Sequence, residues 1–432
     1  MELKKYKLAD IAKIEISGVD KKTMDGEIPV RLCNFVDVYY NWAITKEKAK
    51  SFMVASAKQT EIDKCSIGKD MVAITKDSET RDDIGIATYI ADDFEDVLLG
   101  YHCALITPNP AIVDGKYLNA FMHTRYIQKY FENNASGSGQ RYTLSNDTIS
   151  NIPVLLPSIE EQHTIGKLLA DLDRKIELNK QINDNLEAMA KQLYDYWFVQ
   201  FDFPNEEGKP YKSSGGAMVW KEKLKRKIPN GWTVETVGTY ANCKSGYAIK
   251  SSNFKAKGIP VIKIGNIQED YTLNMNGCQY IENNTNKLFY VYQNDVVIAM
   301  TGATIGKFAI VPFSETGYFV NQRVGKFEFG NNPIKKMPYL INSLKIDYFR
   351  NQIFQLASGC AQPNISVEQI NNISLLYPST KILSEYNMKC KWMYEQIANC
   401  RYQIDVLTKL RDKLLPLLMN GQALVNYHLS DD

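Results

Sequence analysis

The sequence lacks any apolar run long enough to cross a membrane and any pattern of residues that would hold a metal. Only four histidines are present, none in an H-E-x-x-H pattern, and the eight cysteines are scattered without a C-x-x-C pair. A structural metal is therefore not expected, and reduced thiols fit this spacing best. No window approaches the ~18 apolar residues of a membrane helix, and the first residues lack the apolar stretch of a signal peptide. We expect a cytoplasmic protein with no membrane contact.

Motifs of the common catalytic sites are also missing. There is no Pro-Pro dipeptide, so the Asn-Pro-Pro-aromatic loop of amino-methyltransferases is absent, and neither G-x-S-x-G nor G-x-G-x-x-G after a strand occurs. The segment Gly302–Phe308 has one residue too few between its glycines for a phosphate loop, and Phe308 stands where Ser or Thr must reach magnesium. Asp114-Gly-Lys116 fits a nuclease pattern only loosely. We expect a binding protein with no catalytic residues, no metal and no cofactor of its own.

Neither sign of charge dominates. The chain has 51 Lys and Arg against 49 Asp and Glu, a net charge of +2, so affinity for a polyanion must come from local patches. Hydrophobic residues at 44% and charged residues at 23% are typical of soluble globular proteins. A length of 432 residues predicts two or three domains at roughly 100–200 residues each.

An internal duplication organises the chain. Residues Tyr117–Gln140 align without a gap on Tyr339–Gln362 with seven identities in 24 positions, and Thr143–Ser158 align on Asn364–Ser379 with seven in 16. A period of about 220 residues is far longer than the roughly 20–50 residues of a solenoid unit. It predicts duplication of a whole module.

Each copy has a mixed first part followed by a long helix. Ile28-Pro-Val30 recurs as Ile259-Pro-Val261, which extends the repeat upstream. Short apolar runs between turn residues predict strands at 71–75, 296–300 and 307–311, and helical spacing at 117–132 and 339–355 lies between the strand-like blocks.

Long heptad-like patterns predict the two helices. Apolar residues at alternating 4-3 spacing run from 159 to about 198, interrupted by Asn179 and Asn183, and again from 386 to 418. A buried Asn in such a seam fixes register and favours one partner helix, although packing on the helix's own domain would also account for the pattern. Pro416 should bend or end the second helix, with Gly421 as its cap.

The domain boundaries follow from these patterns. We predict an α+β protein with a first domain at 1–157, a first long helix at 158–202, a linker and second domain at 203–378, and a second long helix with a tail at 379–432. Residues 203–216 form a Pro/Gly/Ser-rich joint. Residues 212–263 then carry eleven Lys and Arg against two acidic residues, either as a solvated linker or as a strip facing phosphates.

Several segments together resemble the specificity subunits of type I restriction–modification systems from end to end. These are two Ala-Ser-Gly-x-x-Gln segments (135–140 and 357–362), Pro157-Ser-Ile-Glu-Glu-Gln162, Asp171-Leu-Asp-Arg-Lys-Ile-Glu177, Asn185-Leu-Glu-Ala-Met189, Trp197-Phe-Val-Gln-Phe-Asp202, Ile228-Pro-Asn-Gly-Trp232 and Leu414-Leu-Pro-Leu-Leu-Met-Asn-Gly-Gln422. The second helix departs from this pattern because it opens with Thr380-Lys-Ile-Leu-Ser-Glu385, so contacts made by the first opening should be absent there.

The resemblance implies two target-recognition domains separated by two antiparallel helices in a pseudo-twofold arrangement. Such a chain reads a split sequence in double-stranded DNA and assembles with two methyltransferase subunits and with restriction/translocase subunits. S-adenosylmethionine, ATP and magnesium are used by those partners. A coiled-coil scaffold joining two non-DNA ligand-binding domains, and a nuclease with an unrecognised site, are the alternatives.

Groove readers need amides and guanidiniums for base edges and Lys, Ser, Thr or backbone N–H groups for phosphates. Gly-rich loops in both copies meet this requirement, although a loop that only caps the preceding helix, or polar residues at a strand edge, would look similar. We group with these candidates Tyr101 and His102 in the first copy and Asn321, which precedes Gln322 and Arg323, in the second. The candidate DNA-binding residues are Lys69, Lys76, Arg81, Ser136, Gly137, Gln140, Arg141, Tyr142, Lys263, Thr301, Thr304, Lys307, Gln322, Arg323, Ser358, Gly359, Gln362 and Asn364.

Overall fold

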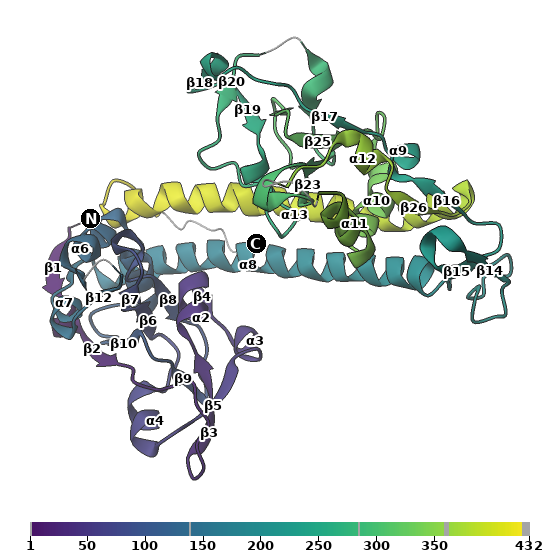
Figure 1. Cartoon of the computed structure of the whole chain (residues 1–432). Coiled ribbons are helices and arrows are strands. Elements are labelled where there is room, and N and C mark those ends of the chain that lie inside the picture. Colours follow the sequence, from purple (N-terminus) through teal and green to yellow (C-terminus); the bar gives the residue numbers. More distant parts are fainter. Residues whose placement is uncertain (1, 138–139, 284–285, 358–362, 426–432) are drawn as a thin grey trace, which may run out of the picture. The chain divides into compact units, whose positions relative to one another are not determined.

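A computed structural model of the chain describes residues 2–137, 140–283, 286–357 and 363–425 (Figure 1). The chain divides into two compact units. Unit 1 comprises Met1–Glu177 and Val406–Asp432, and unit 2 comprises Leu178–Asp405. Both are mixed helix and sheet, which confirms the expected α+β class. Within the described ranges, no helix is long and apolar enough to cross a membrane.

Unit 1 contains thirteen strands and, before the first long helix, eight short helices in its described residues. The strands are β1 (Lys4–Lys7), β2 (Ala12–Ile16), β3 (Ile28–Cys33), β4 (Ala43–Ile44), β5 (Met53–Ala57), β6 (Val72–Thr75), β7 (Asp77–Ser78), β8 (Ala87–Ile90), β9 (Val97–Leu99), β10 (Cys103–Pro108), β11 (Ser136–Gly137), β12 (Tyr142–Thr143) and β13 (Pro153–Leu156). The helices are α1 (Leu8–Ile11), α2 (Phe35–Tyr40), α3 (Lys46–Ala49), α4 (Gln59–Cys65), η1 (Arg81–Asp83), α5 (Gly115–Met122), α6 (Arg125–Asn134) and α7 (Asn146–Ser150).

A five-stranded sheet in the order β2-β10-β6-β8-β4 is the centre of unit 1, with smaller sheets β5-β3-β9, β11-β12-β7 and β1-β13 beside it. Successive residues of β6 and β10 point to opposite faces of the sheet, and both faces are buried: Ala73 lies in a cluster on one face, and Val72 and Ile74 lie on the other face in the cluster with the helices. Tyr117 and Phe121 of α5 pack there with Ile165 and Leu169 of the first long helix and Leu418 of the second. The long helices are thus part of the core of unit 1.

Unit 2 repeats this plan with its own elements. Its strands are β14 (Met218–Lys221), β15 (Arg226–Pro229), β16 (Thr233–Thr236), β17 (Cys243–Ser245), β18 (Phe254–Lys255), β19 (Ile259–Ile262), β20 (Tyr280–Ile281), β21 (Tyr290–Val291), β22 (Val296–Ala299), β23 (Phe308–Ile310), β24 (Tyr318–Val320), β25 (Val324–Phe327) and β26 (Ser374–Tyr377). Its short helices are η2 (Asp195–Val199), η3 (Glu222–Leu224), α9 (Val237–Tyr240), η4 (Ser251–Asn253), η5 (Ile264–Asn266), η6 (Lys287–Phe289), η7 (Gly302–Thr304), η8 (Pro333–Lys335), α10 (Met337–Leu344), α11 (Asp347–Ala357) and α12 (Val367–Asn371).

An aromatic cluster forms the core of unit 2 where α10 meets the long helices. The ring of Phe198 lies 4.9 Å from that of Tyr339 and 4.8 Å from that of Tyr386, both edge to face. Such pairs add about 0.5–1.5 kcal/mol each to the free energy gained by burial. The sheet β17-β25-β22-β23 corresponds to β2-β10-β6-β8 of unit 1.

The duplication is visible atom by atom. The hydroxyl of Tyr117 donates to the carbonyl of Leu155 at 2.9 Å, and the hydroxyl of Tyr339 donates to the carbonyl of Leu376. Gly85 and Gly306 share a left-handed backbone, with φ of +78° and +79°, and a Cβ at either position would press on the side chain of the packed helix, Phe131 or Ile353. Only glycine fits this turn in both copies.

The upstream match, however, was wrong by two residues. Lys7 pairs with Pro153 and Thr236 with Ser374, an offset of 229 between the copies. The carbonyl of Cys33 accepts from Gly100 and that of Ile262 from Asn321, which is again an offset of 229. The recurrence of Ile-Pro-Val at an offset of 231 reflects two strands that open with the same three residues, and a three-residue match carries little register information.

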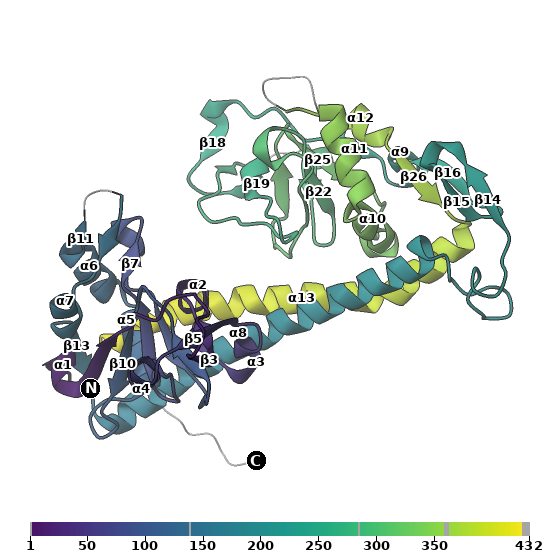
Figure 2. The same cartoon turned by 60° about the horizontal axis from the view of Figure 1, so that its bottom comes forward.

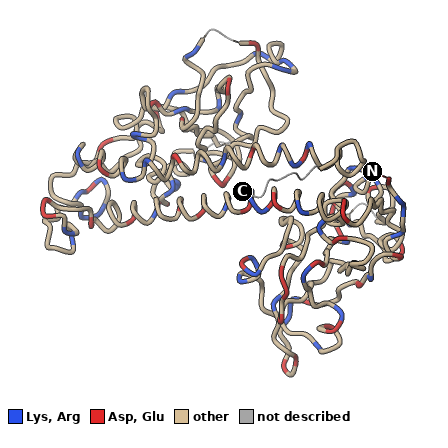
Figure 3. Tube along the Cα trace, turned by 180° about the vertical axis from the view of Figure 1, so that it is seen from behind, with Lys and Arg blue, Asp and Glu red and all other residues tan. Residues whose placement is uncertain are grey.

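The two long helices are α8 (Ile159–Tyr194) and α13 (Thr380–Met419). In unit 1, Asp173 accepts from Arg411 at 3.5 Å, and in unit 2 the amide of Asn179 donates to Gln403 at 3.2 Å. In unit 2, Tyr194 also meets Tyr386. In unit 2, residue numbers on α13 fall from 403 to 386 as those of their partners on α8 rise from 179 to 194, so the predicted antiparallel pairing is confirmed there. Positions of Lys and Arg are interspersed with positions of Asp and Glu along both helices (Figure 3).

The end of α13 differs in part from the prediction. The helix continues through Pro416 to Met419, because a proline so near the C-terminus costs little when the carbonyl it faces can be left to other donors. Gly421 is the predicted cap: its φ is +77°, its N–H donates to Leu418, and the N–H of Gln422 donates to Leu417 at 2.9 Å. These two bonds are the Schellman pattern.

Each helical segment expected between the strand-like blocks is a pair of helices, α5 with α6 and α10 with α11. The side chain of Thr124 caps α6 by accepting from the backbone N–H of Ile127, so the chain turns where an uninterrupted period suggested one helix. The joint after α8 is also packed. Phe203 stacks on Tyr211 and Trp232 at 4.7 and 4.8 Å, and Arg226 covers the ring of Phe201 at 4.5 Å.

Candidate nucleic-acid interface

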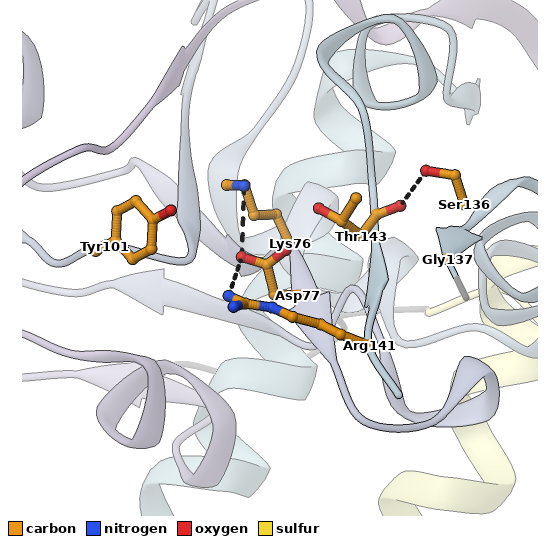
Figure 4. A pocket seen from close by; sticks show the side chains of 7 residues that line it. All are labelled: Lys76, Asp77, Tyr101, Ser136, Gly137, Arg141 and Thr143. Carbon is orange, nitrogen blue, oxygen red and sulfur yellow. Dashed lines mark hydrogen bonds and ion pairs between the residues drawn. The ribbon is translucent and has the colours of Figure 1, made fainter. Parts of the chain in front are cut away.

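A cavity of about 450 Å³ opens in unit 1 beside the three-stranded sheet β11-β12-β7. Strands β11 and β7 of this sheet are labelled in Figure 2. Its walls come from the end of β6, the turn before β10, and the hairpin that contains the first Ala-Ser-Gly-x-x-Gln segment. The lining residues are Lys76, Asp77, Tyr101, Ser136, Gly137, Arg141 and Thr143 (Figure 4). Four of them, Lys76, Ser136, Gly137 and Arg141, were predicted from the sequence, so the structure brings these together.

Asp77 is the centre of this site. Its Oδ2 lies 2.5 Å from Nδ1 of His102, 3.2 Å from Nη2 of Arg141 and 3.4 Å from Nζ of Lys76. Burial alone would raise the pKa of Asp77, but hydrogen bonds from Thr143 and His102 and the charges of Lys76 and Arg141 lower it below its usual value. The carboxyl group is therefore an anion at neutral pH, held among donors.

The hairpin reaches the cavity because its strands pair closely. Thr143 lies opposite both Ser136 and Asp77, and the N–H of Leu144 donates to the carbonyl of Lys76 at 2.8 Å. A Cβ at Gly137 would lie 2.2 Å from the carbonyl oxygen of Arg141, so glycine is needed where the strands approach. The Ala-Ser-Gly pattern thus has a structural reason as well as a functional one.

Other predicted residues of unit 1 lie around the rim or away from it. The guanidinium of Arg81 covers the ring of Tyr142 at 5.0 Å. Gln140, which precedes Arg141 in the chain, is exposed. Lys69, by contrast, precedes β6 whereas Lys76 follows it, and its backbone N–H donates to Asp93. Because β6 separates them by its whole length, Lys69 does not belong to the cavity.

The corresponding position of unit 2 has the same backbone frame. The N–H of Ile365 donates to the carbonyl of Met300 as that of Leu144 does to Lys76, and the N–H of Met300 donates to Arg323 as that of Lys76 does to His102. The backbones of Thr301 and Asn364 pair in an isolated antiparallel β-bridge. The predicted residues Thr301, Arg323 and Asn364 are therefore brought together, and they take the places of Asp77, His102 and Thr143.

The remaining predicted residues of unit 2 are more dispersed. The hydroxyl of Thr304 donates to the carbonyl of Thr301 at 3.5 Å, and Gln322 is exposed next to Arg323. Lys307 forms an ion pair with Glu269 at 3.0 Å. Lys263 lies over the ring of Phe254 at 4.3 Å and donates to Gln279. Ser358, Gly359 and Gln362 lie outside the described residues.

Sequence reasoning missed Asp77 and Thr143. An acidic residue was not sought in an interface for a polyanion, and Thr143 was used only to align the repeat. The signal was present, since aligning Val72-Ala-Ile-Thr75 with Val296-Val-Ile-Ala299 places Asp77 opposite Thr301. Within the described part of the chain, no group of three or more His, Cys, Asp or Glu is arranged to hold a metal ion.

Comparisons with known proteins agree with this architecture. Residues 1–188 and 229–386 match the family model described as type I restriction modification DNA specificity domain. The chain is 26% identical over 326 residues to the type I restriction enzyme MjaIX specificity subunit of Methanocaldococcus jannaschii, covering 74% of this chain and 71% of that one. It is 23% identical over 398 residues to the HindI specificity subunit of Haemophilus influenzae, covering 80% and 85%.

One solved structure shares the fold over nearly the full length. The S subunit of the type I restriction–modification system from M. genitalium matches with a TM-score of 0.62 and 16% identity, covering 97% of this chain and 96% of that one. At this identity the likeness concerns the fold alone.

Proposed function

The chain belongs to the type I restriction–modification DNA specificity family, and from this premise we propose that each of its two domains reads one half of a bipartite sequence in double-stranded DNA. As a specificity subunit it selects the sequence for a complex whose catalysis lies in other subunits. The comparisons give no support to a scaffold for non-DNA ligands.

The observation that carries this proposal is one backbone frame with two sets of side chains. Asp77, His102 and Thr143 in unit 1 are replaced by Thr301, Arg323 and Asn364 in unit 2, on the same ladder of backbone hydrogen bonds. A shared frame can approach DNA in the same way twice, since phosphate contacts set position, while different side chains read different base edges. The two half-sites should therefore differ in sequence.

The partners are the finer part of the proposal. In unit 2 the long helices expose large apolar side chains, Leu178, Ile182 and Met189 on α8 and Met388 and Trp392 on α13. Exposed apolar surface of this kind marks protein contacts, and we assign it to two methyltransferase subunits, with restriction/translocase subunits joining for cleavage. Those subunits would use S-adenosylmethionine, ATP and magnesium. The length of the helices would set the spacer between the half-sites.

Mapping of methylated bases in genomic DNA tests this function. Cells that carry the intact system should show one bipartite methylated motif. Gln140→Ala should relax one half of that motif and Asn364→Ala the other, each by roughly 1–3 kcal/mol of discrimination per lost bidentate contact. A continuous motif, or loss of both halves from either change, would contradict reading by two independent domains. Magnesium-dependent cleavage by the chain alone would favour a nuclease instead.

A further inference from the structure

We propose that Asp77 is a positioning residue that aims the guanidinium of Arg141 at a guanine in the half-site read by unit 1. The proposal rests on the function above and adds which base chemistry the first domain selects and which residue makes that selection possible. The Asp77 carboxylate is an anion that lies inside a candidate binding site for DNA, which is itself a polyanion. Only 10% of the Asp77 side chain is exposed, at the centre of the cavity in Figure 4.

An acidic group here would repel DNA phosphates if it acted alone. It is instead surrounded by donors from three segments: Lys76 at the end of β6, His102 in the turn before β10, and Arg141 in the hairpin. A carboxylate that gathers several donors holds their side chains in one arrangement. The residue that gains most is Arg141, because its side chain is 54% exposed and would otherwise be free to move.

The contacts of Arg141 hold one end of its guanidinium and leave the rest open. Nη2 donates to Asp77 and lies against the imidazole of His102. Nη1 and Nε have no partner among the described residues. The guanidinium carries five N–H donors in a rigid fork, and each parallel pair includes one N–H of Nη2. Since Nη2 gives one N–H to Asp77, its other N–H can form such a pair with Nη1 toward a ligand.

The backbone of His102 also points to a built arrangement. Its φ is +74°, a left-handed conformation that costs a non-glycine residue free energy and is found where the surroundings impose it. The backbone carbonyl of His102 accepts from Lys76, while its ring lies between Asp77 and Arg141. The turn thus supplies a second support under the guanidinium.

Guanine is the base that matches a held guanidinium. Its major-groove edge offers two acceptors, O6 and N7, in the geometry of the arginine fork, which is the commonest specific contact between proteins and DNA. A phosphate can also accept two bonds from the fork, but its affinity depends on positive charge, which the Asp77 carboxylate offsets. An arginine that is paired with an acid is therefore better suited to a base edge than to the DNA backbone.

Variants in the intact complex test this proposal by base-resolved methylation mapping. Arg141→Ala should relax one G·C position in one half-site, with discrimination falling about 10- to 100-fold. Arg141→Lys keeps the charge and loses the fork, so it should relax the same position. Asp77→Asn, which is nearly isosteric, should weaken discrimination at that one position, and the lower stability that follows from the uncompensated cations should change methylation of all sequences alike.

Asp96→Asn is the matched control. It breaks an Arg–Asp pair of the same unit, where Arg31 donates to Asp96 at 2.8 Å from β3, and it should leave the motif unchanged. The proposal is overturned if Arg141→Ala relaxes an A·T position or no position. It is also overturned if Arg141→Lys restores full activity, or if methylation slows equally at all sequences, as loss of a phosphate contact would produce. A wild-type motif that is not bipartite would instead overturn the proposed function.

Discussion

Glu187 of α8 joins three parts of unit 2, and its replacement by glutamine should destabilise that unit. Its carboxylate accepts from Nζ of Lys345, at the end of α10, at 2.8 Å, and from Nη2 of Arg401, on α13, at 2.9 Å. The three side chains are between 12% and 24% exposed. One carboxylate thus compensates two cations that hold the domain and both helices together.

The expected loss in the free energy of unfolding follows from the burial of Lys345 and Arg401. Removing one partner of a fully buried ion pair costs about 3–5 kcal/mol because the other charge is left uncompensated. Since Glu187 retains some exposure, we expect Glu187→Gln to lower the free energy of unfolding by about 2–3 kcal/mol. A more exposed pair where α8 continues into η2, Lys191 with Asp195, gives the control, because Asp195→Asn should cost at most about 0.5 kcal/mol.

The pH dependence has a definite sign. Burial lowers the pKa of Lys345 below its usual value, against the opposing effect of Glu187. The unfolded chain therefore holds this proton more tightly, and the contribution of Lys345 to stability rises with pH up to its unfolded pKa of about 10.4. Glu187→Gln lowers the pKa of Lys345 further, so the stability difference between wild type and variant should be largest near pH 7 and shrink toward pH 10.

Denaturant unfolding followed by tryptophan fluorescence measures this, since four of the five tryptophans lie in unit 2. Replacing all three residues together, as Glu187→Leu, Lys345→Met and Arg401→Leu, should restore much of the stability, because an apolar substitute avoids the desolvation of the ions. If Glu187→Gln costs no more than Asp195→Asn, or its cost grows toward pH 10, the reasoning about uncompensated charge is wrong.

Three further predictions concern the helices. Gln162 is 1% exposed and bonds the N–H of Asp114 and two carbonyls, so Gln162→Leu should destabilise unit 1 by about 2–4 kcal/mol in thermal unfolding. Leu172→Asp, on the same helix, should do so by several kcal/mol, and an unchanged melting temperature would argue against the seam. Four residues inserted in both helices, beside Asn179 and beside its partner Gln403, should lengthen the spacer in the methylated motif by one or two base pairs. An unchanged spacer would show that the helices do not set it.

The insertion illustrates what the sequence alone could not decide. The heptad pattern reports one helix at a time, so it does not show that an insertion in α8 needs a matching insertion in α13. The bonds Asp173–Arg411 and Asn179–Gln403 fix the register of α8 against α13, so four residues inserted in one helix alone would break that register on one side. Partner identity is a tertiary property, and periodicity does not contain it.

Much of the architecture was nevertheless readable, because duplication supplies an internal comparison. Strands β6, β22 and β23 lie where alternating apolar runs predicted them, and the Gly421 cap follows from local chemistry. The prediction that contacts made at the start of α8 are absent at the start of α13 is also confirmed. The buried residue Leu383 takes the place of Gln162 and has no side-chain amide to make its hydrogen bonds. The breaks after α5 and α10 were missed because a capping threonine or a short turn leaves the apolar period intact.

The candidate site shows why a shared frame and variable reading can coexist in one fold. The features common to both copies are backbone hydrogen bonds, the tight glycines Gly85 and Gly306, and the tyrosine hydroxyls that fasten α5 and α10 to the strand before each long helix. None of these depends on the side chains that face the cavity. Under the proposed function, substitution of a side chain such as Asp77 by threonine, as in the second copy, should therefore change the bases that are read without moving the backbone that presents the side chain. Specificity can diverge in each domain separately while the core and the helices stay the same.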